Sequence, residues 1–223
     1  MDENKKRTIK LYNMDIVSPY MNTGDFWEMP IINNDRYIPD KLIGFNEALT
    51  SKDNKAGVHF FLDDYQFERI WKEPNRYINV LSKFTCILSP DFSLYMDMPK
   101  PLQIYNTYRS RLIGQYYQDK GLRVIPTISW GDKNTFNFCF RGIPKQSIVA
   151  ISTIGVRRNK ETLKIWEAGK NEMIRQIEPS TILIYGGNID TETKGINTIW
   201  YENKTIKRLK ESELKGDKDE KKS

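Results

Sequence analysis

Five short apolar runs, separated by stretches with helical periodicity, constrain the fold of this chain most. They are VHFFL (58–62), FTCIL (84–88), LRVIPTI (122–128), SIVAIS (147–152) and TILIY (181–185). Each run is β-branched or aromatic and continuous rather than alternating, which is typical of strands buried on both faces of a parallel sheet. Successive runs begin about 25 to 40 residues apart, and this rhythm indicates βαβ units.

Two of the segments between the runs predict amphipathic helices. Residues 101–121 begin at Pro101, carry an apolar stripe and reach Gly121 just past the expected end. Residues 161–179 place their apolar side chains on one side and stop at Pro179.

Three further segments carry weaker patterns. A helix is expected within 64–81, interrupted at Pro74, and a short one over about 40–49. In residues 133–144, phenylalanines alternate with polar neighbours, which favours an extra strand or hairpin arm.

The chain is expected to form one α/β domain with a mainly parallel sheet or a partial (β/α) barrel. Its 223 residues hold no evident repeat and no linker rich in Gly, Ser or Pro. A full eight-stranded barrel normally needs about 250 residues, so the incomplete version fits better. We expect an irregular N-terminal segment (1–39) packing on the core, the core domain (40–203) and a charged, disordered tail (204–223).

The composition excludes several classes of protein. Aromatic residues make up 12% of the chain, and no apolar stretch approaches the roughly 20 residues that cross a bilayer, so neither disorder nor a membrane partner is expected. The N-terminal MDENKKRTIK lacks an apolar segment, which predicts a cytoplasmic protein.

Rare residues and absent motifs exclude further classes. One histidine and two cysteines cannot build a four-ligand zinc site, and the sequence contains no HExxH, GxSxG, Walker A loop or GxGxxG. Cys86 and Cys139 lie in apolar runs and are expected to be buried free thiols. His59, in VHFFL, is expected to fill a strand position.

The net charge of +6 and the pI near 9.1 suggest a nucleic-acid partner, but they belong to the ends of the chain. Residues 1–10 contribute +2 and residues 204–223 contribute +3, leaving +1 for residues 11–203. A nucleic-acid function must therefore rest on a local cluster around Arg109, Arg157 and Arg158.

The carboxyl ends of the predicted strands locate a candidate site, because loops and helix N-termini converge there. Asp91 and Asp97 follow the second run and Asp132 follows the third. We predict these three aspartates as catalytic acid or base groups or as ligands of Mg²⁺ or Mn²⁺, which prefer oxygen. Asp and Ser are also ordinary turn and helix-cap residues, so a structural role stays open.

Other residues at the same edge are expected to bind a substrate. Trp130 offers a stacking surface or a core aromatic ring. Arg157 and Arg158, with Ser152 and Thr153, precede the second helix and suit a phosphate group, while Gly186 and Gly187 could cradle an anion or turn the chain.

A helical wheel of residues 102–119 places Arg109 within the apolar arc, whereas Arg111 points away. A buried arginine needs a partner, because an unpaired buried charge costs several kcal/mol. Asp91 and Asp97 are candidate partners, and Arg109 is interpreted as an anion clamp or as one half of a structural ion pair. Lys170 also falls within the apolar arc of its helix, where a lysine side chain can still reach the surface.

Residues 40–188 resemble a phage- and mobile-element-borne family, domain of unknown function forty-four seventeen. The resemblance rests on SPDFSLYMDMP (89–99), the YRSRLIG helix (108–114) and the SWGD turn (129–132). It implies a bacterial, phage or plasmid context and carries no established activity. Its pieces coincide with the strand ends chosen above.

The leading hypothesis is chemistry on a nucleotide or nucleic-acid phosphate at the carboxyl edge of the sheet, with a divalent metal as an open possibility. The alternative is a non-catalytic protein that binds a host protein or DNA, for example against host defence, through its aromatic segment from Tyr20 to Tyr37. A glycosidase-like carboxylate pair is a third possibility.

Overall fold

The computed structural model describes residues 11–18 and 20–203, with the side chain of Arg157 outside the description. The tail predicted over 204–223 and the first ten residues of the N-terminal segment lie outside the described residues.

In the described residues, seven parallel strands form two sheets, and the strands follow chain order in both. The first sheet contains β1 (Leu42–Gly44), β2 (Gly57–His59), β3 (Cys86–Leu88) and β4 (Val124–Ile125). The second contains β5 (Ile148–Ser152), β6 (Thr181–Tyr185) and β7 (Asn197–Tyr201). Each of the five apolar runs overlaps one of these strands, β2 to β6, which confirms their prediction.

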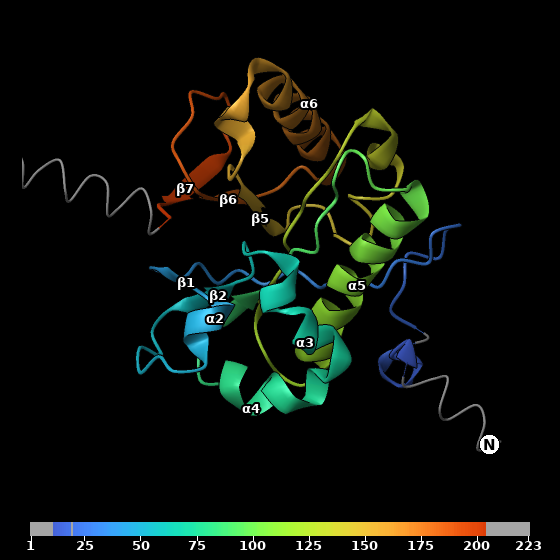
Figure 1. Ribbon diagram of the computed structural model, residues 1–223, viewed down its shortest axis with the longest axis vertical. Coiled ribbons are helices and arrows are strands. Elements are labelled where there is room, and N and C mark those ends of the chain that lie inside the picture. The colour runs from blue at the N-terminus through green and yellow to red at the C-terminus, as the bar shows by residue number, and fades with distance from the viewer. Residues whose placement is uncertain (1–10, 19, 204–223) are drawn as a thin grey trace, which may run out of the picture.

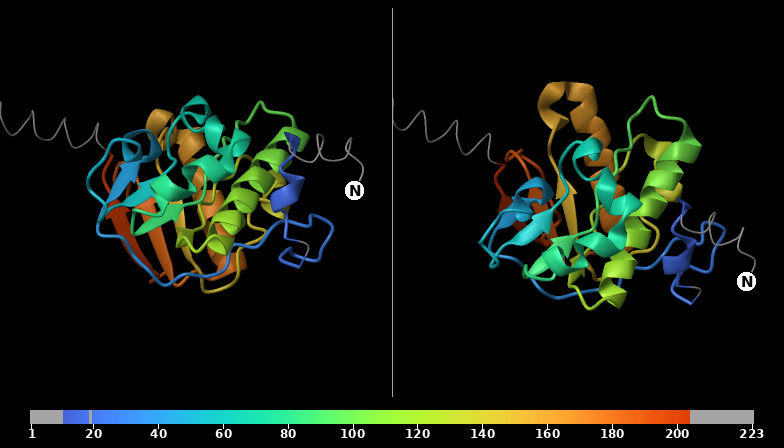
Figure 2. Two further views of the ribbon diagram at one scale, coloured as in Figure 1. Left: turned by 90° about the horizontal axis from the view of Figure 1, so that it is seen from below. Right: turned by 60° about the horizontal axis from the view of Figure 1, so that its bottom comes forward.

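A short parallel bridge joins the two sheets. Thr127, just beyond β4, pairs with Ala150 of β5. The Ile128 amide donates to the Ala150 carbonyl at 2.8 Å, and the Ala150 amide donates to the Pro126 carbonyl at 2.9 Å. The two sheets therefore lie side by side, and the long helices pack against them (Figure 2).

Two long helices flank the sheets, α5 (Lys100–Asp119) and α6 (Lys160–Ile177), as predicted (Figure 1). The Asn159 side chain caps the start of α6, and Glu178 ends the helix in a left-handed conformation just before Pro179. Short helices fill the predicted region 64–81: η2 (Asp64–Gln66), α3 (Glu68–Lys72), η3 (Pro74–Tyr77) and α4 (Ile78–Leu81). The remaining short helices are η1 (Met14–Ile16), α2 (Phe45–Ala48), η4 (Lys133–Asn137) and η5 (Val156–Arg158).

Three buried apolar clusters hold the layers together. The first joins the four-stranded sheet to α2, α3, α4 and α5, and the second joins β5 and β6 to α6. The third draws on both sheets, with Leu88 of β3, Ile125 of β4 and Leu183 of β6 among its members. This shared cluster makes the chain one α/β domain with parallel sheets, as predicted. The partial barrel stays a prediction.

The N-terminal segment lies across α5. Met29 and Ile32 are buried, and the side-chain amide of Gln115 donates to the carbonyls of Met21 and Ile31. Gly142 has φ of +75°, and a Cβ there would lie 2.2 Å from the Pro30 carbonyl oxygen, so only glycine fits this crossing.

The sequence reading of three segments was wrong or incomplete. The region 40–49, predicted as a helix, begins with β1, because Leu42 to Gly44 pair with β2 and leave only Phe45–Ala48 helical. The extra strand or hairpin arm predicted over 133–144 is not formed: Lys133–Asn137 is the helical turn η4, capped by Asp132, and turns follow it. The edge strand β7 was missed, since its residues are mostly half-exposed and form no continuous apolar run.

The predictions for the rare residues are confirmed. Cys86 and Cys139 are buried free thiols, and His59 is a buried residue of β2. In the described part of the chain, no helix combines the length and apolar character needed to cross a membrane.

Candidate functional site

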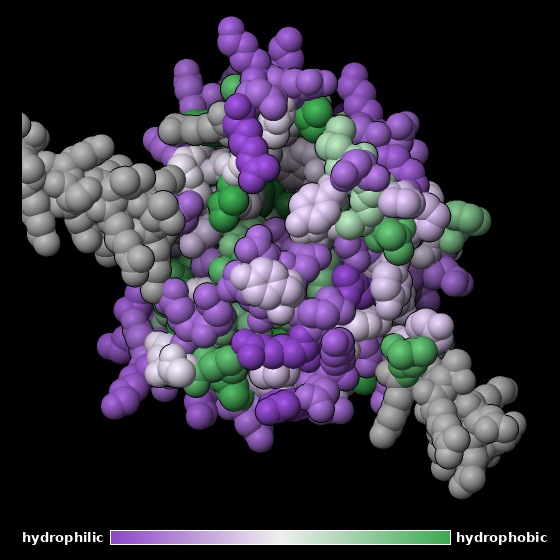
Figure 3. Space-filling model, in the orientation of Figure 1, coloured by the Kyte–Doolittle hydropathy of each residue, from purple (hydrophilic) through white to green (hydrophobic). Residues whose placement is uncertain are grey.

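A cavity of about 680 Å³ opens at the carboxyl ends of β2, β3, β4 and β5, where the sequence predicted a site. Its wall combines residues that follow these strands with the first turns of α6. The surface is hollowed in the upper half of Figure 3, with apolar surface inside and polar side chains around it. Aspartate, hydroxyl, arginine and aromatic side chains share the wall, so the cavity offers several kinds of contact.

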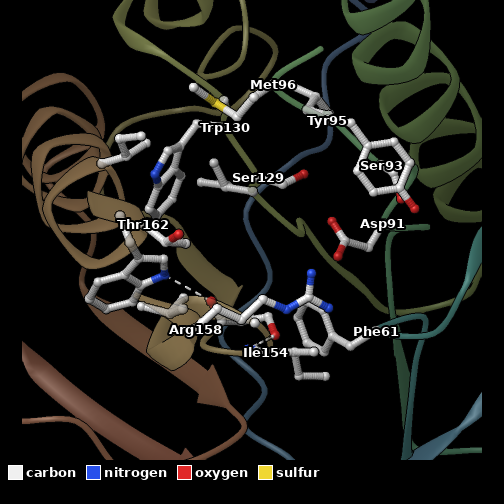
Figure 4. Close-up of a pocket in the computed structure, with 18 of the residues that line it drawn as sticks. Phe61, Asp91, Ser93, Tyr95, Met96, Ser129, Trp130, Ile154, Arg158 and Thr162 are labelled. Atoms are coloured by element: carbon white, nitrogen blue, oxygen red, sulfur yellow. Dashed lines mark hydrogen bonds between the residues drawn. The ribbon is translucent and has the colours of Figure 1, made fainter. Parts of the chain in front are cut away.

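Asp91 lies on this wall, and its carboxylate points toward the middle of the cavity (Figure 4). Among the described residues, its buried Oδ1 has no hydrogen-bond partner. Removal from water raises the pKa of Asp91 to about 7, the negative charge of Asp64 adds to the rise, and a hydrogen bond from Ser129 and the charge of Arg111 oppose it. A carboxyl group with a pKa near neutrality can take up or release a proton at physiological pH.

Asp64 is held in place by Ser93, another residue of the cavity wall. The Ser93 hydroxyl donates to Oδ1 of Asp64 at 2.7 Å, and the Ser93 amide donates to both carboxylate oxygens at 3.2 Å. These bonds fix a second carboxylate whose negative charge acts on Asp91, so the fold itself helps to raise the pKa of Asp91.

Arg158 brings a positive charge to the cavity. It belongs to η5, and its side chain folds over Gly155, whose added Cβ would lie 3.6 Å from Nε of Arg158. Arg158 is exposed, and in the part of the chain that the structure describes no hydrogen bond or ion pair holds its guanidinium, which reaches into the cavity in Figure 4. An unpaired arginine beside the start of a long helix suits an anionic ligand. The side chain of Arg157 is outside the described part.

Aromatic rings form the side of the cavity opposite Asp91. Trp130 and Trp166 line it, with ring centroids 6.1 Å apart, and Trp130 also contacts Phe140 at 6.2 Å. The indole of Trp166 donates to the Ser152 carbonyl at 2.8 Å (Figure 4). Trp130 therefore serves the core on one side and the cavity on the other.

The predicted hydroxyl and glycine residues divide into two groups. Ser152 lines the cavity, where its hydroxyl accepts a hydrogen bond from the Ile154 amide. Thr153 donates instead to the Gly187 carbonyl at 2.8 Å and packs against Gly186. Thr153, Gly186 and Gly187 thus join the loops after β5 and β6, outside the cavity wall.

The structure does not bring the three predicted aspartates together. Asp97 is exposed and lies outside the cavity wall. Asp132 pairs with Lys100 at 2.7 Å and caps η4, and these interactions hold its pKa below the usual range. Within residues 11–18 and 20–203, no group of three or more His, Cys, Asp or Glu side chains could hold a metal ion. The described residues therefore do not bring Asp91, Asp97 and Asp132 together as ligands of one Mg²⁺ or Mn²⁺ ion.

Arg109 has a different partner from those predicted. Its guanidinium donates to both carboxylate oxygens of Glu68 and to the Asn106 side chain. It lies 3.8 Å from the centroid of the Phe92 ring. Arg109 thus forms an ion pair with Glu68 instead of the predicted partners Asp91 and Asp97, and the anion clamp stays a prediction.

Arg111, which the helical wheel pointed away from the core, is buried. Its guanidinium donates to the carbonyls of Arg141, Thr127 and Cys139 at 2.9, 2.9 and 2.7 Å. Burial lowers its pKa to about 10, with the charges of Cys139 and Asp91 opposing the change. The wheel failed because α5 is covered on more than one side, by the sheet and by residues 139–142.

Comparison with known proteins places the chain in a family. A family model described as a domain of unknown function (DUF4417) matches residues 21–202. The gene 1 protein of Mycobacterium phage L5 is 40% identical over 163 residues, which cover 72% of this chain and 71% of that protein. The gene 1 protein of Mycobacterium phage D29 is 38% identical over 163 residues, and the chain spans 60% of its length. No solved structure matches.

Proposed function

This chain belongs to the DUF4417 family, and from that premise we propose that it binds and transforms a nucleotide or nucleic-acid phosphate in the cavity at the carboxyl ends of β2 to β5. One observation carries the proposal: an arginine and a buried carboxyl oxygen, neither with a partner among the described residues, share one aromatic-walled cavity. Buried polar atoms are normally paired, so the bare Asp91 oxygen suits a ligand, and the exposed guanidinium of Arg158 can reach the same ligand from the rim.

Each group has a role in this proposal. Arg158 binds the phosphate, and Trp130 supports the base, since aromatic side chains stack on nucleobases. Asp91 exchanges a proton with the substrate or with an attacking water, for which a pKa of about 7 is suited. Asp97 and Asp132 have no part in this chemistry. We place the reaction in the cytoplasm, where Cys86 and Cys139 would remain reduced.

Calorimetric titration tests the proposal with inorganic phosphate, nucleoside phosphates and short single-stranded DNA as probes. Arg158→Ala should abolish phosphate-dependent binding, and Asp91→Asn should remove turnover of a bound substrate while retaining the binding. Arg175→Ala is the matched control, since it removes an equally exposed arginine of α6 that pairs with Glu172 away from the cavity. Phosphate binding that survives Arg158→Ala would contradict the proposal.

A second candidate is the binding of a host protein or DNA through the N-terminal segment. Tyr20 is 92% exposed and Phe26 is 88% exposed, although large aromatic side chains are usually buried. Deletion of the whole segment would uncover the core at Met29 and Ile32. The double variant Tyr20→Ser, Phe26→Ser is therefore the cleaner test, and it should lose partner binding at an unchanged melting temperature.

A further inference from the structure

The contact between Trp130 and Gly169 reveals how the aromatic wall of the cavity is built. A Cβ placed on Gly169 of α6 would lie 2.1, 2.2 and 2.4 Å from Nε1, Cδ1 and Cε2 of Trp130. Nearly equal distances to three atoms of the five-membered ring place this Cβ above the face of the ring, because an approach at the edge would favour one atom. One face of the indole therefore rests against the backbone of α6.

The Trp130 side chain also presents surface to the cavity. The side chain is partly exposed and lines the cavity. Its ring neighbours in the described residues, Phe140 and Trp166, are tilted by 54° and 43°, so neither stacks parallel to it. An indole supported from behind and open in front is a flat platform for a planar ring.

The charges of the cavity limit how many phosphates a ligand can carry. Among the lining residues, the charged side chains are Asp63, Asp91 and Arg158. One guanidinium can pair with a single phosphate group. A triphosphate would bring about four negative charges toward two carboxyl groups, and like charges in such a site repel each other.

We propose that the ligand is a singly phosphorylated nucleoside, whose base stacks on the open face of Trp130 while its phosphate meets Arg158. Gly169 is the positioning residue that sets the depth of this stacking platform. The inference rests on the proposed phosphate function and narrows its substrate class. A volume of about 680 Å³ lies within the range of roughly 300–1,000 Å³ that small-molecule sites occupy.

Calorimetry on the full chain tests the ligand class with AMP, GMP, CMP and UMP, the matching triphosphates without Mg²⁺, adenosine, and inorganic phosphate. At least one monophosphate should bind ten times or more tightly than its triphosphate, than adenosine and than inorganic phosphate. A triphosphate that binds more tightly than the monophosphate overturns the inference and leaves the proposed function standing. Absence of binding by every phosphate compound overturns both.

Two variants test the platform. Trp130→Leu should weaken monophosphate binding by roughly one to two orders of magnitude and leave inorganic phosphate binding unchanged. Gly169→Ala pushes the indole into the cavity and should have the same selective effect. Because this methyl group also crowds the core, the double variant Gly169→Ala, Trp130→Leu should regain the melting temperature of Trp130→Leu. Unchanged monophosphate affinity in Trp130→Leu contradicts the stacking role.

Discussion

Nη1 of Arg109 donates to both carboxylate oxygens of Glu68, at 2.9 and 2.8 Å, and so ties α5 to α3. The same guanidinium covers the ring of Phe92 at 3.8 Å from its centroid. Because Phe92 directly follows Asp91, this ion pair holds the backbone that presents the carboxyl group of the cavity. Arg109 therefore positions the site without entering it.

Replacement of Glu68 tests the importance of this ion pair. Glu68→Gln should lower the free energy of unfolding by about 1–3 kcal/mol, because Arg109 is only 8% exposed and would keep a buried charge without its counter-ion. The partial exposure of Glu68 places the effect below that of a fully buried pair. Urea denaturation measures it. Glu73→Gln, which breaks the exposed pair with Arg76, is the control and should change stability little. Equal effects of the two variants would speak against the assignment.

The buried Arg111 should be among the most sensitive positions of the core. Arg111→Met leaves the carbonyls of Thr127, Cys139 and Arg141 without their donors, so unfolding free energy should fall by about 3–5 kcal/mol. Arg111→Lys should also destabilise, since one ammonium group cannot reproduce the planar fork. Thermal and urea denaturation measure the stability of these variants, and Arg175→Met, which replaces an exposed arginine, is the control. Similar stability of these variants would show that the three bonds contribute little.

The pattern of apolar runs was sufficient to predict the parallel strands, because strands buried on both faces leave a continuous signal. The same reasoning could not find β7, whose NTIWY sequence lies at the edge of its sheet and stays half-exposed. It also missed β1, since three residues are too few to show a period and their pairing with β2 overrides the local preference.

The location of the candidate site could be predicted from the sequence, but only some of the residues that line it could. Strand order determines which loops meet, so Asp91, Trp130, Ser152 and Arg158 share one cavity as the strand-end rule requires. The rule does not predict the path of a loop or the direction of its side chains. Asp132 therefore pairs with Lys100 and does not line the cavity. Gly169 was the available signal for the platform, because glycine inside a helix costs about 1 kcal/mol relative to alanine and needs a packing reason.

The buried Lys170 should control the order of the connection between β6 and β7. Its ammonium, 1% exposed, donates to Glu167 and to the Glu192 carbonyl at 2.6 Å each, and to the Thr191 hydroxyl. Lys170→Met should therefore speed amide hydrogen exchange in residues 188–196, measured by mass spectrometry, and leave α5 unchanged. Lys164→Met, on the exposed side of α6, is the control. Unchanged exchange over 188–196 would mean that the loop is held by other contacts.

The titration of Asp91 should leave a signature in the pH dependence of stability. Its pKa rises from 3.8 to about 7 on folding, so the folded protein binds more protons than the unfolded chain between these values. The stability contribution of this group is complete below about pH 4 and is lost as pH rises through 7. Asp91→Asn should remove that slope, as measured by urea denaturation from pH 4 to pH 8. A variant with the wild-type slope contradicts the raised pKa.

Asp132 provides the opposite control within the same protein. The hydrogen bond from Lys100 lowers its pKa on folding, so its contribution is present above the unfolded value and is lost as pH falls through the folded one. Asp132→Asn should therefore change stability in the acid range and leave the slope between pH 5 and pH 7 intact.

If substrate turnover also follows the pKa of Asp91, activity should change with a midpoint near pH 7 in the wild type and in Asp132→Asn alike. A midpoint shifted by Asp132→Asn would contradict the role of Asp91, because Asp91 lines the cavity and Asp132 does not.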